Sequence, residues 1–350
     1  MAIRIQRQRV RSVASTVIVL GIGCVMTTGC WSKTDHEVIV YAALDREFSE
    51  PILDDFAAAE GITVRASYDI ESTKTVQLVA AIMGEQHRPR CDLFWNNEIL
   101  HTLRLQRAGL LDAYTVPTAD DFPATYRDAN GLWYGIAARA RVLLVNTDIV
   151  PADQRPSSLH DLIDQRWKGQ VGIAKPRFGT TATHAAVLFS KWGDIEARKF
   201  FESVRAQVQV MSGNKQVATA VGRGQLAFGL TDTDDAIIEI DNGRPVQIVF
   251  PDQQADQMGA LFIPNTLCLI KGSPNPIDAR RLMDHLLTPA VEINLARGRS
   301  AQFPVNTTVD EPSRALPLDT VRWMEVDFEQ AADHWEAAQT VLTEIFARGD

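Results

Sequence analysis

The sequence predicts a two-lobed α/β protein in which each lobe is a mainly parallel sheet flanked by helices. Apolar, strand-like runs alternate with runs of helical period along most of the chain, which is typical of parallel sheets covered by helices. Two long extended segments, residues 131–148 and 259–272, interrupt this alternation. With 350 residues, of which 45% are hydrophobic, the chain is long for one domain and can form two cores.

The first part of the fold is predicted to alternate between strand and helix three times. Residues 37–44 ("EVIVYAAL") have the pattern of a buried strand, and residues 49–61 have helical period and end at a glycine. The same two patterns recur twice more, in strands 62–68 and 91–95 and in helices 73–85 and 98–109. This beginning favours parallel strands with helices on the faces of the sheet.

The alternation resumes after the first extended segment and continues until the second. We expect a short helix within 156–169 and a further one that ends near Gly243. The remaining expected elements are strands at 170–176, 208–213, 225–230 and 246–253, and helices at 181–193, 194–207 and 214–224. Mainly helical sequence follows the second extended segment.

The two extended segments are predicted to carry the chain from one lobe to the other and back. The crossings fall near residues 137–147 and 260–271. Lobe 1 is therefore expected to comprise residues 37–138 plus 264–350, and lobe 2 residues 139–263. Two lobes joined by paired crossovers form a hinge around a cleft.

Residues 1–30 are predicted to be an export signal rather than part of the fold. Four arginines precede an apolar run (13–26), which is the order of a secretory signal and is shorter than the about 20 apolar residues of a spanning helix. The residues before Cys30 resemble a bacterial lipobox, although Thr27 stands where leucine is usual. We expect lipidation of Cys30, with an ordinary cleaved signal as the alternative. The mature chain then has 321 residues (350 minus 29), and losing four arginines changes its charge from −9 to −13.

Charge and cysteine content exclude some classes of function. A net charge of −9 argues against binding nucleic acid or an anionic membrane surface through overall charge, so a lipid anchor is the only membrane contact expected. Cys91 and Cys268 lie in apolar runs and lack zinc-ligand spacing, which favours two buried thiols. A disulfide between them is the alternative, because an oxidising compartment would allow one.

Polar residues collect where the predicted strands end. Open parallel sheets bind ligands beyond the carboxyl ends of their strands, so these residues are candidates for a ligand site. They are Asp45, Ser72, Thr73, Asn97, Glu98, Gly179, Thr180, Thr181, Thr231, Asp232, Asp234 and Asp235. Helix capping is the alternative for each single residue, but a helix needs only one cap, and Asn97 and the third aspartate exceed that need.

The hydroxyl-rich turn "FGTT" is the best candidate for binding an anion. It opens a predicted helix, whose backbone N–H groups and dipole can face the anion, but it lacks the spacing of a P-loop. Arg139 and Arg141 are two positions apart in the first crossover, so their side chains lie on the same face of a strand, and either could hold a carboxylate or phosphate. We favour Arg139, because it lies nearer the hinge. An ion pair between the lobes is the alternative.

The motif "FGLTDTDDAIIE" (228–239) contains three aspartates within four positions, whose repulsion must be offset. A helix N-terminus stabilises each negative charge by roughly 0.3–1 kcal/mol, which accounts for one or two of them. The functional interpretation is that at least one carboxylate meets a cation in the cleft. A metal ion held by Asp45, Asp232 and Asp234 is the corresponding hypothesis.

Together these segments resemble a known protein family. The lipobox, "VYAALD", "ESTKTVQL", "RPRCDLFWNNE", "ARARVLLVNT", "KPRFGTTATH" and "FGLTDTDDA" are similar to the periplasmic solute-binding proteins of ABC importers, in the ferric-binding, thiamine-binding and aminoethylphosphonate-binding branch. The similarity covers about residues 37–310. It implies a type II periplasmic binding fold that closes on a small charged solute and delivers it to a permease and its ATPase. We expect a monomer without a cofactor.

The resemblance leaves the solute open. Ferric-binding relatives place adjacent tyrosines where "TDTDD" stands here, and this chain has no tyrosine after Tyr134. Carboxylate oxygens could still bind ferric iron or another metal ion, together with an accompanying anion, and this is the favoured solute. The alternative is a small organophosphonate, phosphorylated or zwitterionic solute. A metal-dependent phosphoryl hydrolase is a remote alternative, because the HExxH and GxSxG motifs are absent from the sequence.

Overall fold

The computed structural model describes residues 36–69, 75–315 and 321–346. The predicted signal with Cys30, and the candidate residues Ser72 and Thr73, lie outside this part of the chain. Within it, no helix combines the length and the apolar character that crossing a membrane requires.

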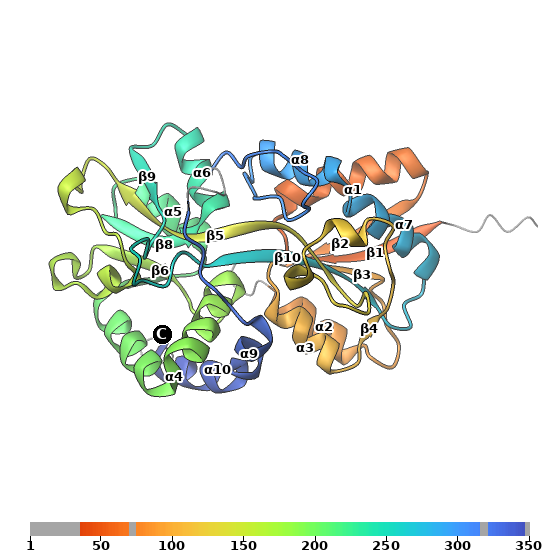
Figure 1. Ribbon diagram of the computed structural model, residues 1–350, viewed down its shortest axis with the longest axis horizontal. Coiled ribbons are helices and arrows are strands. Elements are labelled where there is room, and N and C mark those ends of the chain that lie inside the picture. Colours follow the sequence, from red (N-terminus) through yellow and green to blue (C-terminus); the bar gives the residue numbers. More distant parts are fainter. Residues whose placement is uncertain (1–35, 70–74, 316–320, 347–350) are drawn as a thin grey trace, which may run out of the picture. The chain divides into compact units, whose positions relative to one another are not determined.

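The strands form one sheet in the order β2-β1-β3-β10-β5-β8-β6-β7, with β4 added to β10 and β9 to β5 (Figure 1). The strands are β1 (Glu37–Ala42), β2 (Thr63–Tyr68), β3 (Leu93–Asn96), β4 (Leu111–Asp112), β5 (Tyr134–Asn146), β6 (Val171–Ala174), β7 (Gln209–Met211), β8 (Phe228–Asp232), β9 (Val246–Val249) and β10 (Phe262–Ile270). Parallel pairs join β1 to β2 and β3, and β6 to β7 and β8. The predicted α/β class with parallel strands is confirmed, and β5 and β10 add antiparallel pairs that make the sheet mixed.

The two extended segments are the long strands β5 and β10, which run antiparallel to each other in the middle of the sheet. β5 pairs with β10 through its first half and with β8 and β9 through its second. Ala137 has a φ of 34°, which is rare for a residue other than glycine, and β10 shifts register between Pro264 and Asn265 opposite it. Glu292 accepts a 2.7 Å hydrogen bond from the Ala137 amide and so holds this irregularity.

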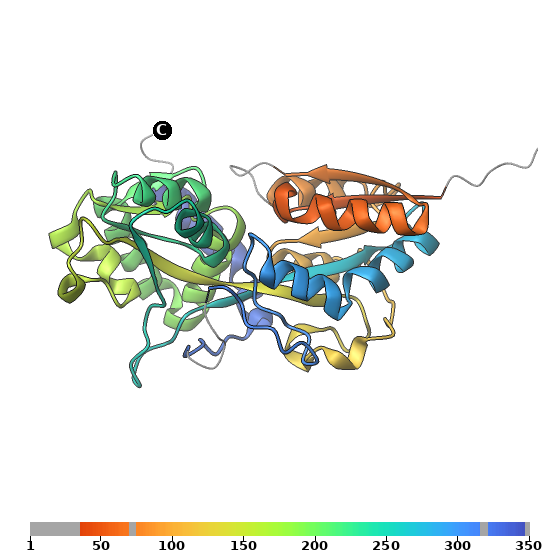
Figure 2. The same cartoon turned by 90° about the horizontal axis from the view of Figure 1, so that it is seen from above.

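Helices cover both faces of the sheet. One face carries α1 (Arg46–Glu60), α5 (Asn214–Gly222), α6 (Thr233–Asp241), α7 (Pro276–Leu286) and α8 (Pro289–Arg297), seen from above in Figure 2. The other carries α2 (Val76–Gly84), α3 (Leu100–Arg107), α4 (Gly179–Gln207), α9 (Phe328–Asp333) and α10 (Trp335–Phe346). Short 3-10 helices are η2 (Ala119–Asp121), η3 (Ala124–Tyr126), η4 (Ala152–Gln154), η5 (Leu159–Ile163) and η6 (Gln165–Trp167).

Two details differ from the prediction for helices. The helices predicted at 181–193 and 194–207 form a single element, α4, which kinks at Gly193 (φ 76°, ψ 165°). A glycine adopts this conformation without steric cost, so the boundary was placed at the right residue. The short helix predicted within 156–169 is two 3-10 turns, η5 and η6.

The C-terminal helix α10 packs against α4, an element of the segment 139–263 that we predict to form lobe 2. Ala338, Leu342 and Phe346 of α10 lie in one core with Phe189 and Phe201 of α4. α9 lies between α3 and α4, where Ser190 of α4 bonds Gln330. The helical period shows that α10 has an apolar face, but the partner of that face is chosen only by the tertiary fold.

Both cysteines of the described region are free and buried, as predicted. Cys91 precedes β3 and Cys268 lies in β10. Burial raises the pKa of the Cys268 thiol, and burial likewise raises the pKa of Cys91 well above its ordinary value. Both side chains are therefore inert, packed thiols.

Candidate functional site

A small polar cavity gathers several of the predicted turns. It has a volume of about 20 Å³, which is room for roughly one water molecule. Its walls are Asn97 after β3, the starts of α4 and α5, and Asp232 at the end of β8. The lining residues are Asn97, Ala174, Lys175, Phe178, Gly179, Thr180, Ser212, Gly213, Asn214 and Asp232.

Two helix N-termini meet at this cavity. α4 begins at Gly179, whose φ of 53° turns the chain from β6 into the helix. α5 begins at Asn214. Phe178 and Gly213 occupy the two N-cap positions, and neither side chain can accept a hydrogen bond. The first-turn N–H groups of both helices therefore receive no bond from an N-cap side chain, and the helix dipoles favour a negative group beside them.

Asp232 forms a buried ion pair with Arg141 at one side of the cavity. Arg141 Nη1 lies 2.7 Å from Asp232 Oδ1, and the side chains are 0% and 5% exposed. The other oxygen, Asp232 Oδ2, accepts bonds from Thr180 (2.5 Å) and Asn214 (2.9 Å). Arg141 also bonds the Thr181 hydroxyl at 3.2 Å. This network ties the starts of α4, α5 and α6 to the middle of β5.

Asp234 is paired in the same way with Arg139. Arg139 Nε lies 3.0 Å from Asp234 Oδ2, and both side chains are buried. Its Nη1 donates to the Asn97 carbonyl at 3.0 Å and its Nη2 to Asn265 Oδ1 at 2.8 Å. Burial alone would lower the pKa of Arg139, but nearby carboxylates outweigh this effect and raise the pKa; they are those of Asp234, Asp232, Asp45 and Asp235.

The repulsion among the three aspartates is therefore offset largely by two arginines from β5. Asp232 occupies the N-cap position of α6, but its side chain does not cap the helix, because it is turned to Arg141. The capping interpretation is also wrong for Thr180, which lies inside α4. Carboxylate oxygens of Asp232, Asp234 and Asp235 come within 4.8 Å of one another, so an acidic cluster does form.

That cluster differs from the predicted metal-binding set. Within the described part of the chain, Asp235 belongs to the cluster and Asp45 does not. Asp45 instead lines a separate open groove of about 470 Å³ with Arg46, Glu47, Glu50 and Lys215. Asp45 is nevertheless close enough to contribute to the electrostatic field at Arg139.

The remaining predicted residues have structural partners in this conformation. Glu98 is fully buried and accepts five hydrogen bonds, one of them from the His101 ring at 3.0 Å. Burial alone would raise the pKa of Glu98, but His101 and the other donors outweigh it and lower the pKa. The Thr231 hydroxyl donates to the Asn214 carbonyl at 3.1 Å. Thr181 lines a neighbouring apolar cavity and bonds Asn214 at 3.0 Å.

Sequence reasoning missed three polar residues of the cavity wall. Ser212 and Asn214 follow β7, and Lys175 follows β6. The signal that identified the other turns was available for these as well, since each stands at the carboxyl end of a predicted parallel strand. Arg141, which we ranked below Arg139, makes more contacts with residues of the cavity wall.

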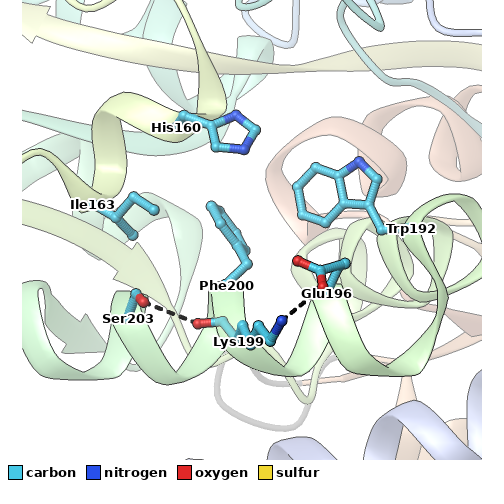
Figure 3. A pocket seen from close by; sticks show the side chains of 7 residues that line it. All are labelled: His160, Ile163, Trp192, Glu196, Lys199, Phe200 and Ser203. Carbon is cyan, nitrogen blue, oxygen red and sulfur yellow. Dashed lines mark hydrogen bonds and ion pairs between the residues drawn. The ribbon is translucent and has the colours of Figure 1, made fainter.

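A second groove lies away from the polar cavity. Figure 3 shows it between η5 and the middle of α4, with His160, Trp192 and Phe200 forming an aromatic wall. Its charged residues satisfy each other, because Lys199 Nζ lies 2.8 Å from Glu196. The groove shares no lining residue with the polar cavity.

The fold and the polar cavity between strand ends define a class of protein, the two-lobed solute-binding proteins. Residues 100–330 match the family described as bacterial extracellular solute-binding protein, and the chain belongs to this family. A putative 2-aminoethylphosphonate-binding periplasmic protein of Salmonella typhimurium is 22% identical over 339 residues, which are 94% of this chain and 90% of that relative.

Two solved structures share the fold. Iron-bound HitA from Pseudomonas aeruginosa superposes with a TM-score of 0.80 at 21% identity, covering 89% of this chain and 99% of that one. The periplasmic binding protein AfuA from Actinobacillus pleuropneumoniae, with exogenous fructose-6-phosphate bound, gives a TM-score of 0.79 at 20% identity with the same coverage. The family resemblance and the two-lobed type II periplasmic fold predicted from the sequence are thereby confirmed. The family is described as solute-binding, and the Salmonella relative and AfuA are both periplasmic binding proteins.

Proposed function

We propose that the chain is the extracytoplasmic solute-binding component of an ABC importer and that its solute is a small organic anion with a phosphate or phosphonate group. The observation that carries this proposal is the meeting of two helix N-termini at one polar cavity. The starts of α4 and α5 present backbone N–H groups there, and Lys175 adds a cationic side chain to the wall. Such an arrangement favours a tetrahedral oxyanion.

The buried ion pairs argue for this solute over ferric iron. Two aspartates of the acidic cluster are already neutralised by Arg139 and Arg141. A cation about 4 Å from a guanidinium group meets a repulsion of roughly 4 kcal/mol per unit charge near a protein surface. The favoured solute of the sequence prediction therefore becomes the second candidate.

Ferric iron remains the second candidate because of one observation. The carboxylates of Asp232, Asp234 and Asp235 lie within 4.8 Å of one another, which is a spacing that a hard cation could bridge. The iron bound in HitA, a structure with the same fold, adds an analogy. Binding iron there would require the arginines to leave their partners.

The cavity is too small for the solute in this conformation, so the two lobes must part to admit it. We infer that they turn about the middle of β5 and β10, where Ala137 and Asn265 depart from regular strand geometry. In this proposal residues 37–138 and the segment that begins at 264 form lobe 1, and residues 139–263 form lobe 2, joined by α10. Cys30 anchors the exported monomer to the membrane by a lipid, and a permease with its ATPase receives the solute.

Thermal denaturation with a panel of solutes tests the proposal. Binding raises the melting temperature by mass action. We expect 2-aminoethylphosphonate, fructose 6-phosphate or inorganic phosphate to raise it, and ferric citrate to leave it unchanged. Elemental analysis of the native protein should find no stoichiometric iron. A rise with ferric iron alone, together with bound iron in the native protein, would overturn the proposal in favour of the second candidate.

A matched pair of lysine variants locates the site. Lys175→Met should weaken binding of the active phosphorus compound by about 10- to 150-fold, the equivalent of a charge-assisted hydrogen bond. Lys215→Met removes an equal charge from the separate groove and should have little effect on affinity. Equal losses in the two variants would point to overall charge rather than to this cavity.

A further inference from the structure

The Glu98 carboxylate is the centre of a buried polar cluster that joins four elements. It accepts bonds from the backbone amides of Leu100 (2.6 Å) and His101 (3.0 Å), at the start of α3. It also accepts from Asn96 of β3 at 2.8 Å. The Glu98 carbonyl accepts from Thr266 of β10 at 3.0 Å. These contacts belong to lobe 1 and the second crossover.

One donor to this carboxylate comes from the other lobe. The Thr183 hydroxyl, in α4, lies 2.9 Å from Glu98 Oε2, and both residues are 0% exposed. Thr183 stands one turn after Gly179, so it belongs to the turn of α4 that follows the N–H groups facing the polar cavity. The bond therefore ties this N-terminus directly to the turn that contains Asn97, the opposite wall of the cavity.

A second contact holds the same turn from the same side. Arg139 donates to the Asn97 carbonyl at 3.0 Å while its Nε pairs with Asp234 of α6. On the lobe 1 side, Thr75 donates to the Asn97 side chain. The turn formed by Asn97 and Glu98 thus accepts two hydrogen bonds from lobe 2 next to the cavity, one from Arg139 and one from Thr183.

We propose that Thr183 and Glu98 form a closure latch, a pair of positioning residues that holds the N-terminus of α4 against the Asn97 turn when the lobes close. Opening the lobes removes one donor from a buried charged acceptor and leaves water to replace it. The latch therefore favours the closed state over the open state that admits a solute. This inference rests on the proposed function, since it places the solute between Asn97 and α4.

Two isosteric variants test whether the effect of the latch is specific to a threonine–glutamate bond that joins the two lobes. Thr183→Val removes the hydroxyl that reaches across the lobes. Thr219→Val removes the hydroxyl that donates to Glu239 at 3.1 Å, a bond between α5 and α6 within lobe 2. Thr183→Ser keeps the donor and serves as the rescue. Melting temperatures check that all three variants fold.

The first measurement needs no solute. Small-angle scattering of the full exported chain should show a more expanded average for Thr183→Val than for wild type, Thr219→Val and Thr183→Ser. The second uses 2-aminoethylphosphonate and inorganic phosphate as probes in stopped-flow fluorescence. Thr183→Val should bind the probe faster, by up to roughly tenfold, because the loss of about one hydrogen bond to a charged group shifts the chain toward the open state that admits the probe.

The outcomes distinguish the latch from the proposed function. Unchanged scattering of Thr183→Val overturns the latch, whether or not wild type binds the probes. Expansion of Thr183→Val in the absence of any probe binding by wild type supports the latch and overturns the proposed solute class. Equal effects of Thr183→Val and Thr219→Val overturn the latch, because they show a loss of packing rather than of a contact between lobes.

Discussion

The turn after β8 and the turn after β3 are both acidic, buried and followed by a helix, yet their carboxylates are neutralised differently. Asp232 and Asp234 pair with two arginines that are distant in sequence, on β5. Glu98 is satisfied mainly by its neighbours, His101 and the first amides of α3. The comparison teaches that an acidic turn at a strand end is a candidate ligand site only until its counter-charges are known.

The largest expected effect comes from removing an arginine of the first turn. Arg141→Met leaves the Asp232 carboxylate buried with neutral donors only, and it should lower the free energy of unfolding by about 3–5 kcal/mol. Urea denaturation followed by circular dichroism measures this. Asp232→Asn in the same chain should restore part of the loss, because it removes the unpaired charge. If Arg141→Met alone lowers the free energy of unfolding by less than about 1 kcal/mol, Arg141 is not the main group that neutralises Asp232.

The second turn should respond less strongly, because its carboxylate has many local donors. Glu98→Gln replaces an acceptor of five bonds by an amide and should cost about 1.5–3 kcal/mol at neutral pH. The pKa of Glu98 lies below its ordinary value of 4.5. Its contribution is therefore fully present above about pH 4.5 and is lost as the pH falls through the lower folded-state pKa. Acid titrations of wild type and variant should converge in that range, and parallel curves would contradict this.

A buried histidine beside the first turn, His184, should make the stability of the protein depend on pH in the mildly acidic range. Burial lowers the pKa of His184 well below its ordinary value of 6.5, and the charge of Arg141 lowers that pKa further. The unfolded chain then binds a proton that the folded chain does not, so stability should fall below about pH 6.5 by up to about 1.4 kcal/mol per pH unit. His184→Leu should reduce this slope. An unchanged slope would assign the acid sensitivity to other groups.

The smallest change in the free energy of unfolding is expected for a partly exposed ion pair, which serves as the reference for the buried pairs. Lys215 of α5 lies 2.7 Å from Glu47 of α1, and both side chains are partly exposed. Lys215→Ala should change the free energy of unfolding by at most about 1 kcal/mol, and less at high salt. Urea denaturation at two salt concentrations tests this. A loss as large as that of Arg141→Met would remove the distinction between buried and exposed pairs.

Most of the fold was predictable because its signals are local. The alternation of strand and helix, the two long strands β5 and β10, and the kink at Gly193 all follow from periodicity or from a glycine. The site was predictable only in outline. Asn97, Gly179, Thr180 and Asp232 do line one cavity, but Asp45 lines another groove and Lys175 was missed.

The sequence by itself determined which residues end each strand and which faces of the helices are apolar, since both depend on the period of neighbouring residues. Only the tertiary structure decided which partners these groups find. It placed Arg141 against Asp232, turned Glu98 toward Thr183, and packed α10 on α4. The physical reason is that ion pairs and packing depend on distance in space. Arg141 and Asp232 are 91 positions apart in the sequence, and Glu98 and Thr183 are 85 positions apart, so each pair comes together only when the whole sheet has formed.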